Sequence, residues 1–186
     1  MRGGAVWLAC QAHTLKVAGS NPARATKYHL VGEYEMLDIK SGSKYPASAL
    51  SNFAPHPFVI DGVECSSMEG FLQSLKFKNS EMQKVVCKLV GKAAKFKGKK
   101  KNWWRDQKLY WKGQEIDRHS KEYQDLLDRA YNALSKNEKF KRALLASGDS
   151  ILTHSIGKRK PNRTILTVGE FCGRLMKIRE RLKSEK

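Results

Sequence analysis

Acidic residues are scarce in this sequence of 186 residues, which has 18 Asp and Glu side chains against 36 Lys and Arg side chains. The net charge of +18 disfavours cationic partners and indicates polyanions or phosphorylated molecules as ligands. The same excess is also typical of a basic, soluble surface without a binding role, because net charge alone specifies function weakly.

Cysteine pairs and metal-ligand clusters are lacking as well. The four cysteines, at positions 10, 65, 87 and 172, show no C-x-x-C or Cys/His ligand spacing. We therefore expect neither a zinc site nor a disulfide framework. The sequence calls for no metal and no other cofactor, and unpaired thiols fit a reducing, cytoplasmic location.

Long apolar runs are also absent. No segment approaches the roughly 20 apolar residues of a membrane span, and the apolar piece at residues 5–10 is too short for a signal peptide. We expect no membrane partner and no obligate protein partner. A chain of this length with 40% hydrophobic residues can bury one ordinary core, which predicts a single domain.

Residues 1–35 differ in character from the rest of the chain. The run Gly19-Ser20-Asn21-Pro22-Ala23 can be encoded by DNA that looks like the T-arm of a tRNA gene. One interpretation is that this segment is a mis-annotated extension and that Met36 is the initiator; the other is a flexible native tail. Either interpretation predicts disorder for 1–35 and a domain over 36–186.

The stretch from residue 50 to 77 organises the predicted domain. Asp61-Gly62 separates two short apolar runs, as expected for a two-residue hairpin turn. Ser66 stands three residues before Glu69, the spacing of a capping box that begins a helix. Glu69 and Lys76 would then lie about 20° apart in azimuth on that helix, so that one face carries a carboxylate and an amine.

Helical periodicity and start signals predict further helices at about 80–90, 120–134, 137–148 and 167–182, with short extended pieces at 37–39, 109–116 and 151–153. The fold class is therefore mainly α, of the α+β type, with a small hairpin and about five to seven helices. Thr167 and Glu170 form a second capping-box pattern, so Glu170 is interpreted first as a cap.

Lysine dominates residues 84–101, where there are eight lysines and no acid, and the run leads directly into Asn102-Trp103-Trp104. Such a run is most often a solvated face. Indoles also stack on nucleobases, at about 1–3 kcal/mol per base. Because adjacent helical residues point about 100° apart, both tryptophans cannot face one pocket equally, and one is expected in the core.

The central stretch contains L-S-N-F-x-P, the D-G hairpin and S-x-E-x-x-x-Q-x-x-K-F. These motifs resemble the NADAR superfamily, and the resemblance continues more weakly to about residue 182. This superfamily includes N-glycosidases of phosphorylated riboflavin-pathway intermediates and glycohydrolases that remove ADP-ribose from guanine. The resemblance implies a single-domain NADAR-like fold.

The same resemblance implies roles for individual residues. Glu69 matches the position of the family's acid or base, and Lys76 matches a lysine that either contacts phosphate or attacks the opened sugar to form a Schiff base. Further matches imply substrate binding by Ser51, Asn52, Phe53, Gln73 and Trp103. Without the resemblance, a cap is the simpler interpretation of Glu69 and a solvated amine that of Lys76.

The sequence departs from the better known branch of the family at residues 154–163. A short cationic loop replaces an expected glycine-rich one, which leaves the recognised base open. Lys158, Arg159, Lys160 and Arg163 in this loop suit phosphate contacts, and an exposed basic loop is the alternative. Whether His154 belongs to the site also stays open.

These observations lead to two functional hypotheses, beside a third possibility of a structural basic protein that would tolerate the loss of all these site residues. The first is an enzyme, a hydrolase that cleaves a ribosyl N-glycosidic bond in a phosphorylated small molecule or in ADP-ribosylated guanine or nucleic acid. The second is a module that binds ADP-ribose or nucleic acid without turnover. The first needs the titrating group of Glu69, whereas the second tolerates its loss.

Overall fold

The computed structural model describes residues 30–31 and 34–185, which form one α+β domain with seven α-helices in that part of the chain. The predicted disorder of 1–35 concerns residues that lie mostly outside the described part. Strand β1 (Leu30–Val31) and the start of strand β2 (Tyr34–Asp38) fall inside that segment and pair with each other in antiparallel fashion.

Most elements begin where a side chain caps a helix or a turn reverses the chain. In chain order after β2 they are α1 (Ala47–Leu50), β3 (Phe58–Ile60), β4 (Val63–Cys65), α2 (Met68–Ser74), α3 (Ser80–Cys87), α4 (Gly91–Lys99), β5 (Lys108–Trp111), β6 (Gln114–Asp117), α5 (Lys121–Leu134), α6 (Glu138–Ala146), β7 (Ile151–Thr153), the 3₁₀ turn η1 (Pro161–Arg163) and α7 (Val168–Ser184).

Two short hairpins and one small sheet make up the β component. β3 pairs with β4 across Asp61-Gly62, which have the positive φ angles of 48° and 79° that the sequence predicts. β5 pairs with β6 across Lys112-Gly113, at φ 50° and 80°. β7 lies parallel to β2, so the small sheet joins segments from opposite ends of the domain.

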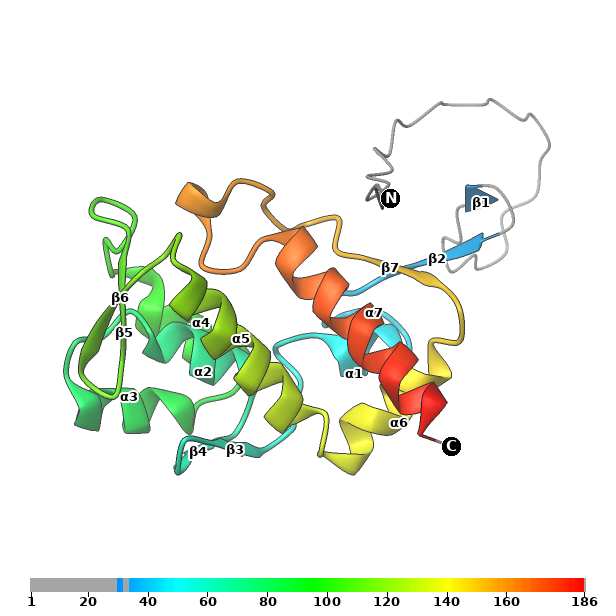
Figure 1. Cartoon of the computed structure of the whole chain (residues 1–186), viewed down its shortest axis with the longest axis horizontal. Coiled ribbons are helices and arrows are strands. Elements are labelled where there is room, and N and C mark those ends of the chain that lie inside the picture. Colours follow the sequence, from blue (N-terminus) through cyan, green and yellow to red (C-terminus); the bar gives the residue numbers. More distant parts are fainter. Residues whose placement is uncertain (1–29, 32–33, 186) are drawn as a thin grey trace, which may run out of the picture.

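The two halves of the domain meet at α5 and α7. Figure 1 shows α2, α3, α4 and the β5–β6 hairpin at one end, and β2, β7 and α6 at the other. Helix α5 buries one stripe, which includes Tyr123, Leu127 and Tyr131, and α7 buries Phe171 and Leu175. Both stripes belong to the single hydrophobic core.

The helix starts follow the sequence in most places. Ser120, Asn137 and Thr167 cap α5, α6 and α7, and Thr167 forms its capping box with Glu170. The lysine-rich run differs from expectation. Gly91 does not end a helix there; it has a φ of 53° and begins α4, which the sequence pattern did not predict.

Candidate active site

Helix α2 begins one residue later than the sequence predicted. Ser67, not Ser66, is the N-cap, and its Oγ accepts a hydrogen bond from Gly70 N at 3.0 Å. The Ser67 hydroxyl also donates to Leu89 O at 2.9 Å. A Cβ on Gly70 would lie 2.5 Å from Leu89 O and 2.7 Å from Cys87 O, so only glycine permits this close packing.

The predicted capping box of Ser66 and Glu69 does not form, which leaves the Glu69 carboxylate to other partners. The side chain is only 7% exposed. Gln73 Nε2 donates to Glu69 Oε1 at 2.8 Å, and Lys95 Nζ lies 3.8 Å from the same oxygen. The Glu69 backbone N–H donates to Asn52 O at 2.8 Å, so the start of α2 is tied to the loop that carries the first predicted ligand contacts.

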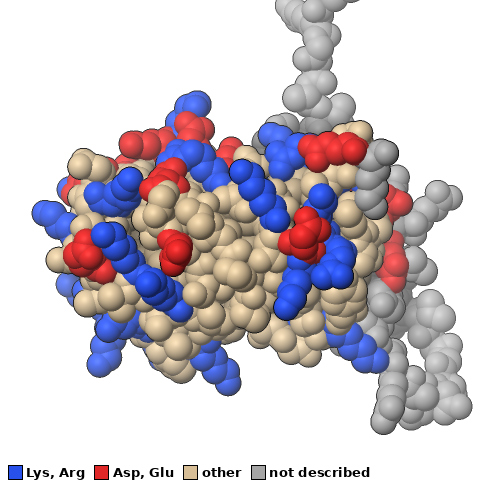
Figure 2. All heavy atoms as spheres, turned by 90° about the horizontal axis from the view of Figure 1, so that it is seen from below, with Lys and Arg blue, Asp and Glu red and all other residues tan. Residues whose placement is uncertain are grey.

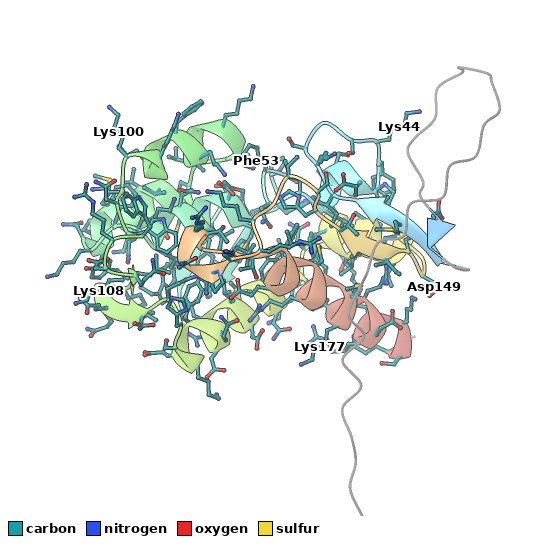
Figure 3. The ribbon with its side chains drawn as sticks, turned by 90° about the horizontal axis from the view of Figure 1, so that it is seen from above. Lys44, Phe53, Lys100, Lys108, Asp149 and Lys177 are labelled. Carbon is teal, nitrogen blue, oxygen red and sulfur yellow. The ribbon has the colours of Figure 1, made fainter. Side chains whose placement is uncertain are left out.

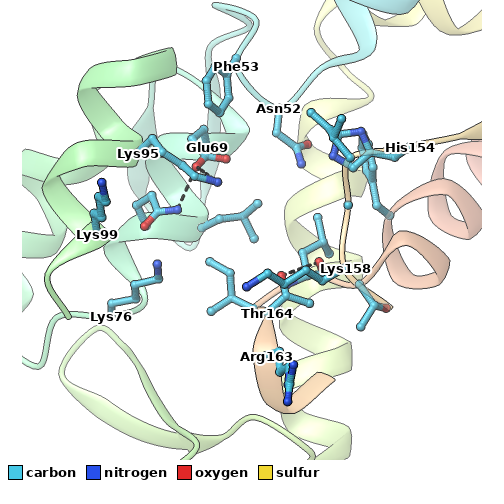
Figure 4. Close-up of a pocket in the computed structure, with 18 of the residues that line it drawn as sticks. Asn52, Phe53, Glu69, Lys76, Lys95, Lys99, His154, Lys158, Arg163 and Thr164 are labelled. Atoms are coloured by element: carbon cyan, nitrogen blue, oxygen red, sulfur yellow. Dashed lines mark hydrogen bonds and ion pairs between the residues drawn. The ribbon is translucent and has the colours of Figure 1, made fainter. Parts of the chain in front are cut away.

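That loop is held in place by one hydrogen bond within it and one from helix α5. Ser51 Oγ accepts from Phe53 N at 3.3 Å, and the buried Tyr131 hydroxyl donates to Asn52 Oδ1 at 3.0 Å. Phe53 is half-buried, and Lys95 Nζ lies 6.0 Å from the centre of its ring. Asn52 and Phe53 therefore stand at the cavity wall beside Glu69, as Figure 4 shows.

Lys76 does not share a helix face with Glu69, contrary to the sequence prediction. Helix α2 ends at Ser74 with Leu75 as its C-cap, so Lys76 follows the helix. It nevertheless lines the same cavity. The pKa of Lys76 is lowered to about 8, and burial is the largest cause. The charges of Lys95 and Lys158 also lower the pKa, whereas the carboxylate of Glu69 raises it.

Helix α4 supplies a cationic wall that was not expected from the sequence. It packs on α2 through Gly98, where a Cβ would lie 2.0 Å from Gln73 Oε1. That oxygen is buried and has no hydrogen-bond partner among the described residues. Lys95 and Lys99 extend from α4 along the cavity (Figure 4). This helix was not predicted from the sequence because a face of lysines with few apolar positions shows little helical periodicity.

The opposite wall is the segment after β7. His154 Nδ1 donates to Ile39 O at 2.6 Å, and its ring packs edge-on against Phe171 at 5.5 Å. His154, Lys158 and Arg163 line the cavity. Arg159 and Lys160 do not line it, so the structure separates these two residues from the other predicted phosphate contacts.

Glu170 anchors this wall from outside the cavity. Buried Arg118 donates to both of its carboxylate oxygens, at 3.0 and 2.7 Å, and donates through Nε to Thr164 O at 3.0 Å. Burial by itself raises the pKa of Glu170, but hydrogen bonds from Arg118, Thr167 and Gln124 outweigh burial and lower the pKa. Glu170 is a cap and an anchor, as its capping-box spacing predicts.

The walls enclose a cavity of about 650 Å³, within the about 300–1,000 Å³ range of small-molecule sites. Of the predicted site residues, all except Arg159 and Lys160 line it, and Trp104 and His154 line it too. Among its described lining residues Glu69 is the one carboxylate, whereas the lysines and arginines are Lys76, Lys95, Lys99, Lys101, Lys158 and Arg163. The cavity therefore suits an anionic ligand.

Trp103 and Trp104 lie in a turn and not in a helix, and both line the cavity, so the expectation that one of them would be buried in the core was wrong. Trp103 is half-buried and packs against the core, although it also touches the cavity. Trp104 is 53% exposed. Within residues 30–31 and 34–185, no group of three or more His, Cys, Asp or Glu is placed to hold a metal ion, and no helix is long and apolar enough to cross a membrane.

The described residues form an α+β domain with a cavity whose charged lining is mostly cationic. The chain is similar in structure to the E. coli protein YbiA, solved by NMR, with a TM-score of 0.56 and 17% identity over 85% of this chain and 90% of that chain. A likeness at this identity concerns the fold, and it confirms the predicted fold class.

The chain belongs to the family described as bacteriophage protein GP30.3, whose sequence model matches residues 44–180. A relative from Enterobacteria phage T4, described as an uncharacterized 17.1 kDa protein in the Gp30-rIII intergenic region, is 41% identical over 150 residues. The match covers 78% of this chain and 98% of the T4 protein.

Proposed function

We propose that the chain is an N-glycosidase that hydrolyses the bond between a ribosyl carbon and a nitrogen in a phosphorylated substrate. The observation that carries the proposal is the placement of Glu69, a buried carboxylate on the wall of a cavity whose other charged lining residues, among those described, are lysines and an arginine. The cations suit phosphate. The resemblance of residues 50–77 to NADAR enzymes adds the substrate class, a riboflavin-pathway intermediate or an ADP-ribosylated guanine or nucleic acid.

The reaction needs one titrating group close to the scissile bond. When the carbon–nitrogen bond breaks, positive charge develops on the sugar, water supplies the new oxygen, and the nitrogen leaves with a proton. Gln73 and Lys95 hold Glu69 Oε1, whereas Oε2 has no hydrogen bond to a described residue. Oε2 is then the atom that takes a proton from water or relays one to nitrogen, at a gain of ~10²–10⁴-fold.

Lys76 has two proposed roles that differ in its charge. As a phosphate contact it acts in the protonated form. As a nucleophile on the opened sugar it acts as a neutral amine, and its carbon–nitrogen double bond is later hydrolysed to release the sugar. A pKa of about 8 leaves both forms populated near neutral pH.

A binding module without turnover is the second candidate. It is favoured by the six cationic residues of the cavity lining and by the exposed ring of Trp104, which hold a ligand without any help from Glu69. The two candidates predict different results when the Glu69 carboxylate is lost. The enzyme loses turnover, whereas the binding module keeps its function of holding the ligand.

The substitution Glu69→Gln tests the proposal because Gln keeps the shape and still accepts a hydrogen bond from Gln73. We expect an unchanged melting temperature, nearly unchanged ligand affinity and a fall in turnover of ~10²-fold or more. The assay incubates the protein with ADP-ribosylated DNA and with phosphorylated riboflavin intermediates and measures released base by mass spectrometry. Glu81→Gln, at an exposed residue outside the cavity, is the matched control.

Near-native turnover by a folded Glu69→Gln protein on the identified substrate contradicts the catalytic role. Binding of these substrates by the unaltered chain without release of base selects the binding module instead.

A further inference from the structure

Trp104 is an exposed aromatic residue with a fixed backbone. Its side chain is 53% exposed, yet it lines the cavity. The turn that carries it is closed by a hydrogen bond from Gln107 N to Trp103 O at 2.9 Å. Gln107 Nε2 donates to Trp104 O at 2.7 Å and to Asn162 O at 3.2 Å. Trp104 is therefore positioned beside η1 and contributes little to the core. Its ring contacts Arg105, whose Cζ lies 5.4 Å from the ring centre, and a large part of its apolar surface stays exposed.

Phe53 and Trp104 lie toward opposite ends of one wall. A Cβ on Gly91, the first residue of α4, would lie 3.7 Å from the Phe53 ring. The nine residues of α4 then extend the wall by about 12 Å before the chain reaches Lys100, Lys101 and the turn of Trp104. Figure 3 shows Phe53 and Lys100 well separated along this side of the molecule.

Positive charge occupies the space between these two aromatic residues. Lys99 and Lys101 line the cavity from the side of α4, and Lys158 and Arg163 line it from the opposite wall. In Figure 4 Glu69 lies near Phe53, while Arg163 lies at the far end of the view. Along the cavity, the ring of Phe53 and the carboxylate of Glu69 come first, the cationic side chains follow, and the ring of Trp104 comes last.

We propose that Trp104 forms a second subsite, which stacks a flat heteroaromatic ring such as a purine that is joined through phosphate to the part of the ligand beside Glu69. Lys99, Lys101 and Arg163 contact the phosphate, and the indole contacts the face of the ring. The identity of the end beside Glu69 rests on the proposed function, whereas the stacking of the second ring does not. A ligand that ends at its phosphate leaves this subsite empty.

AMP and ribose 5-phosphate test the subsite, because they share the phosphate and the sugar and differ by the purine. Calorimetric titrations use the Glu69→Gln protein, so that no probe is consumed. We expect AMP to bind about 10-fold more tightly than ribose 5-phosphate, which is the effect of one stacked base. Trp104→Ala is expected to remove this difference without changing the affinity for ribose 5-phosphate, and Trp104→Phe to keep most of it.

Phe96→Ala is the matched control, because Phe96 is a 63% exposed aromatic residue near the same helix end that does not line the cavity. It is expected to leave the ratio of the two affinities unchanged. If Trp104→Ala binds AMP as much more tightly than ribose 5-phosphate as the parent protein does, the subsite is overturned. It is also overturned if Phe53→Leu, with Trp104 intact, loses this preference for AMP, because the purine then lies beside Glu69.

The two proposals fail in different ways. Absence of turnover by the unaltered chain on every ribosyl substrate tested, with the AMP preference retained, sinks the N-glycosidase and leaves the subsite. Turnover with no dependence of AMP binding on Trp104 sinks the subsite alone.

Discussion

The charge of Lys76 decides between its two proposed roles. Its pKa is lowered to about 8, first by burial, so the amine is protonated below pH 8 and neutral above it. If Lys76 contacts phosphate, affinity for the substrate falls as pH rises through about 8. If it is the nucleophile, turnover rises through the same range. The pH profiles of KM and kcat between pH 6 and 9 separate the two.

Lys76→Arg is the matched variant, because it keeps the charge and removes the nucleophile. If Lys76 contacts phosphate, the Lys76→Arg protein is expected to retain turnover within about 10-fold. Borohydride added during turnover by the unaltered chain should then leave the mass of that chain unchanged. A reduced adduct on Lys76, or loss of more than 10²-fold in Lys76→Arg, contradicts the phosphate role.

Gly98 lets Gln73 reach Glu69. In Gly98→Ala the new Cβ would lie 2.0 Å from Gln73 Oε1, so Gln73 has to move and Glu69 Oε1 loses its orienting hydrogen bond. We expect a fall in turnover of about 10-fold and a loss of stability of about 1–3 kcal/mol, measured by kinetics and urea denaturation. Gly169→Ala, at an exposed helical glycine where the new methyl group would have nothing within 4 Å, should leave turnover unchanged and should not lower stability. Equal behaviour of the two variants would mean that Gln73 does not orient Glu69.

Sequence reasoning identified single residues better than it placed them. It selected Glu69, Gln73 and Lys76, which line one cavity. It put the helix start at Ser66 when Ser67 is the cap, because two adjacent serines offer the same hydroxyl and only packing against Leu89 distinguishes them. It missed the pairing of Arg118 with Glu170, which are 52 residues apart and share no local pattern.

The cationic loop after β7 contains two pairs of charges in different positions. Lys158 and Arg163 line the cavity, whereas Arg159 and Lys160 do not. Replacing the first pair by Gln should weaken pyrophosphate binding by about 10-fold and flatten its dependence on salt, because two charges that face the ligand are lost. Calorimetry between about 50 and 300 mM NaCl measures both effects.

Replacing Arg159 and Lys160 by Gln removes the same net charge and should have a much smaller effect. Equal losses in the two double variants would assign the affinity to the overall charge of the protein and not to the cavity.

Among the elements, those with a local start signal were predicted well. The Asp61-Gly62 hairpin and the helices capped by Ser120, Asn137 and Thr167 are present as expected. Helix α4 was missed because it begins without a side-chain cap and carries lysines on four of its nine positions. Its stability comes from Ala94 and Gly98, which are buried, and such tertiary packing leaves no periodic pattern in so short a helix.

The net charge of the whole chain, +18, should make stability depend on salt. Figure 2 shows basic and acidic side chains interspersed on the face in view, yet the excess of positive charge still produces self-repulsion in the folded state. Added NaCl screens it, so we expect the melting temperature to rise on the order of 2–4 °C between low salt and 0.3 M NaCl. A thermal melt at each concentration checks this.

Sodium sulfate at equal ionic strength is the control. General screening predicts the same rise in both salts. A much larger rise in sulfate would indicate that the anion binds, for which the cationic cavity is the candidate, and a fall in both salts would show that local ion pairs outweigh the repulsion.

The parallel pairing of β2 with β7 constrains the order in which the protein is completed on the ribosome. His154, just after β7, bonds the carbonyl of Ile39, which lies 115 residues earlier. At about 5–20 residues per second, that separation of 115 residues corresponds to about 6–23 s of synthesis. During this time Leu37 and Ile39, both buried in the finished domain, lack their partner strand. Nascent chains that stall before β7 emerges should therefore expose these residues to chaperones and proteases.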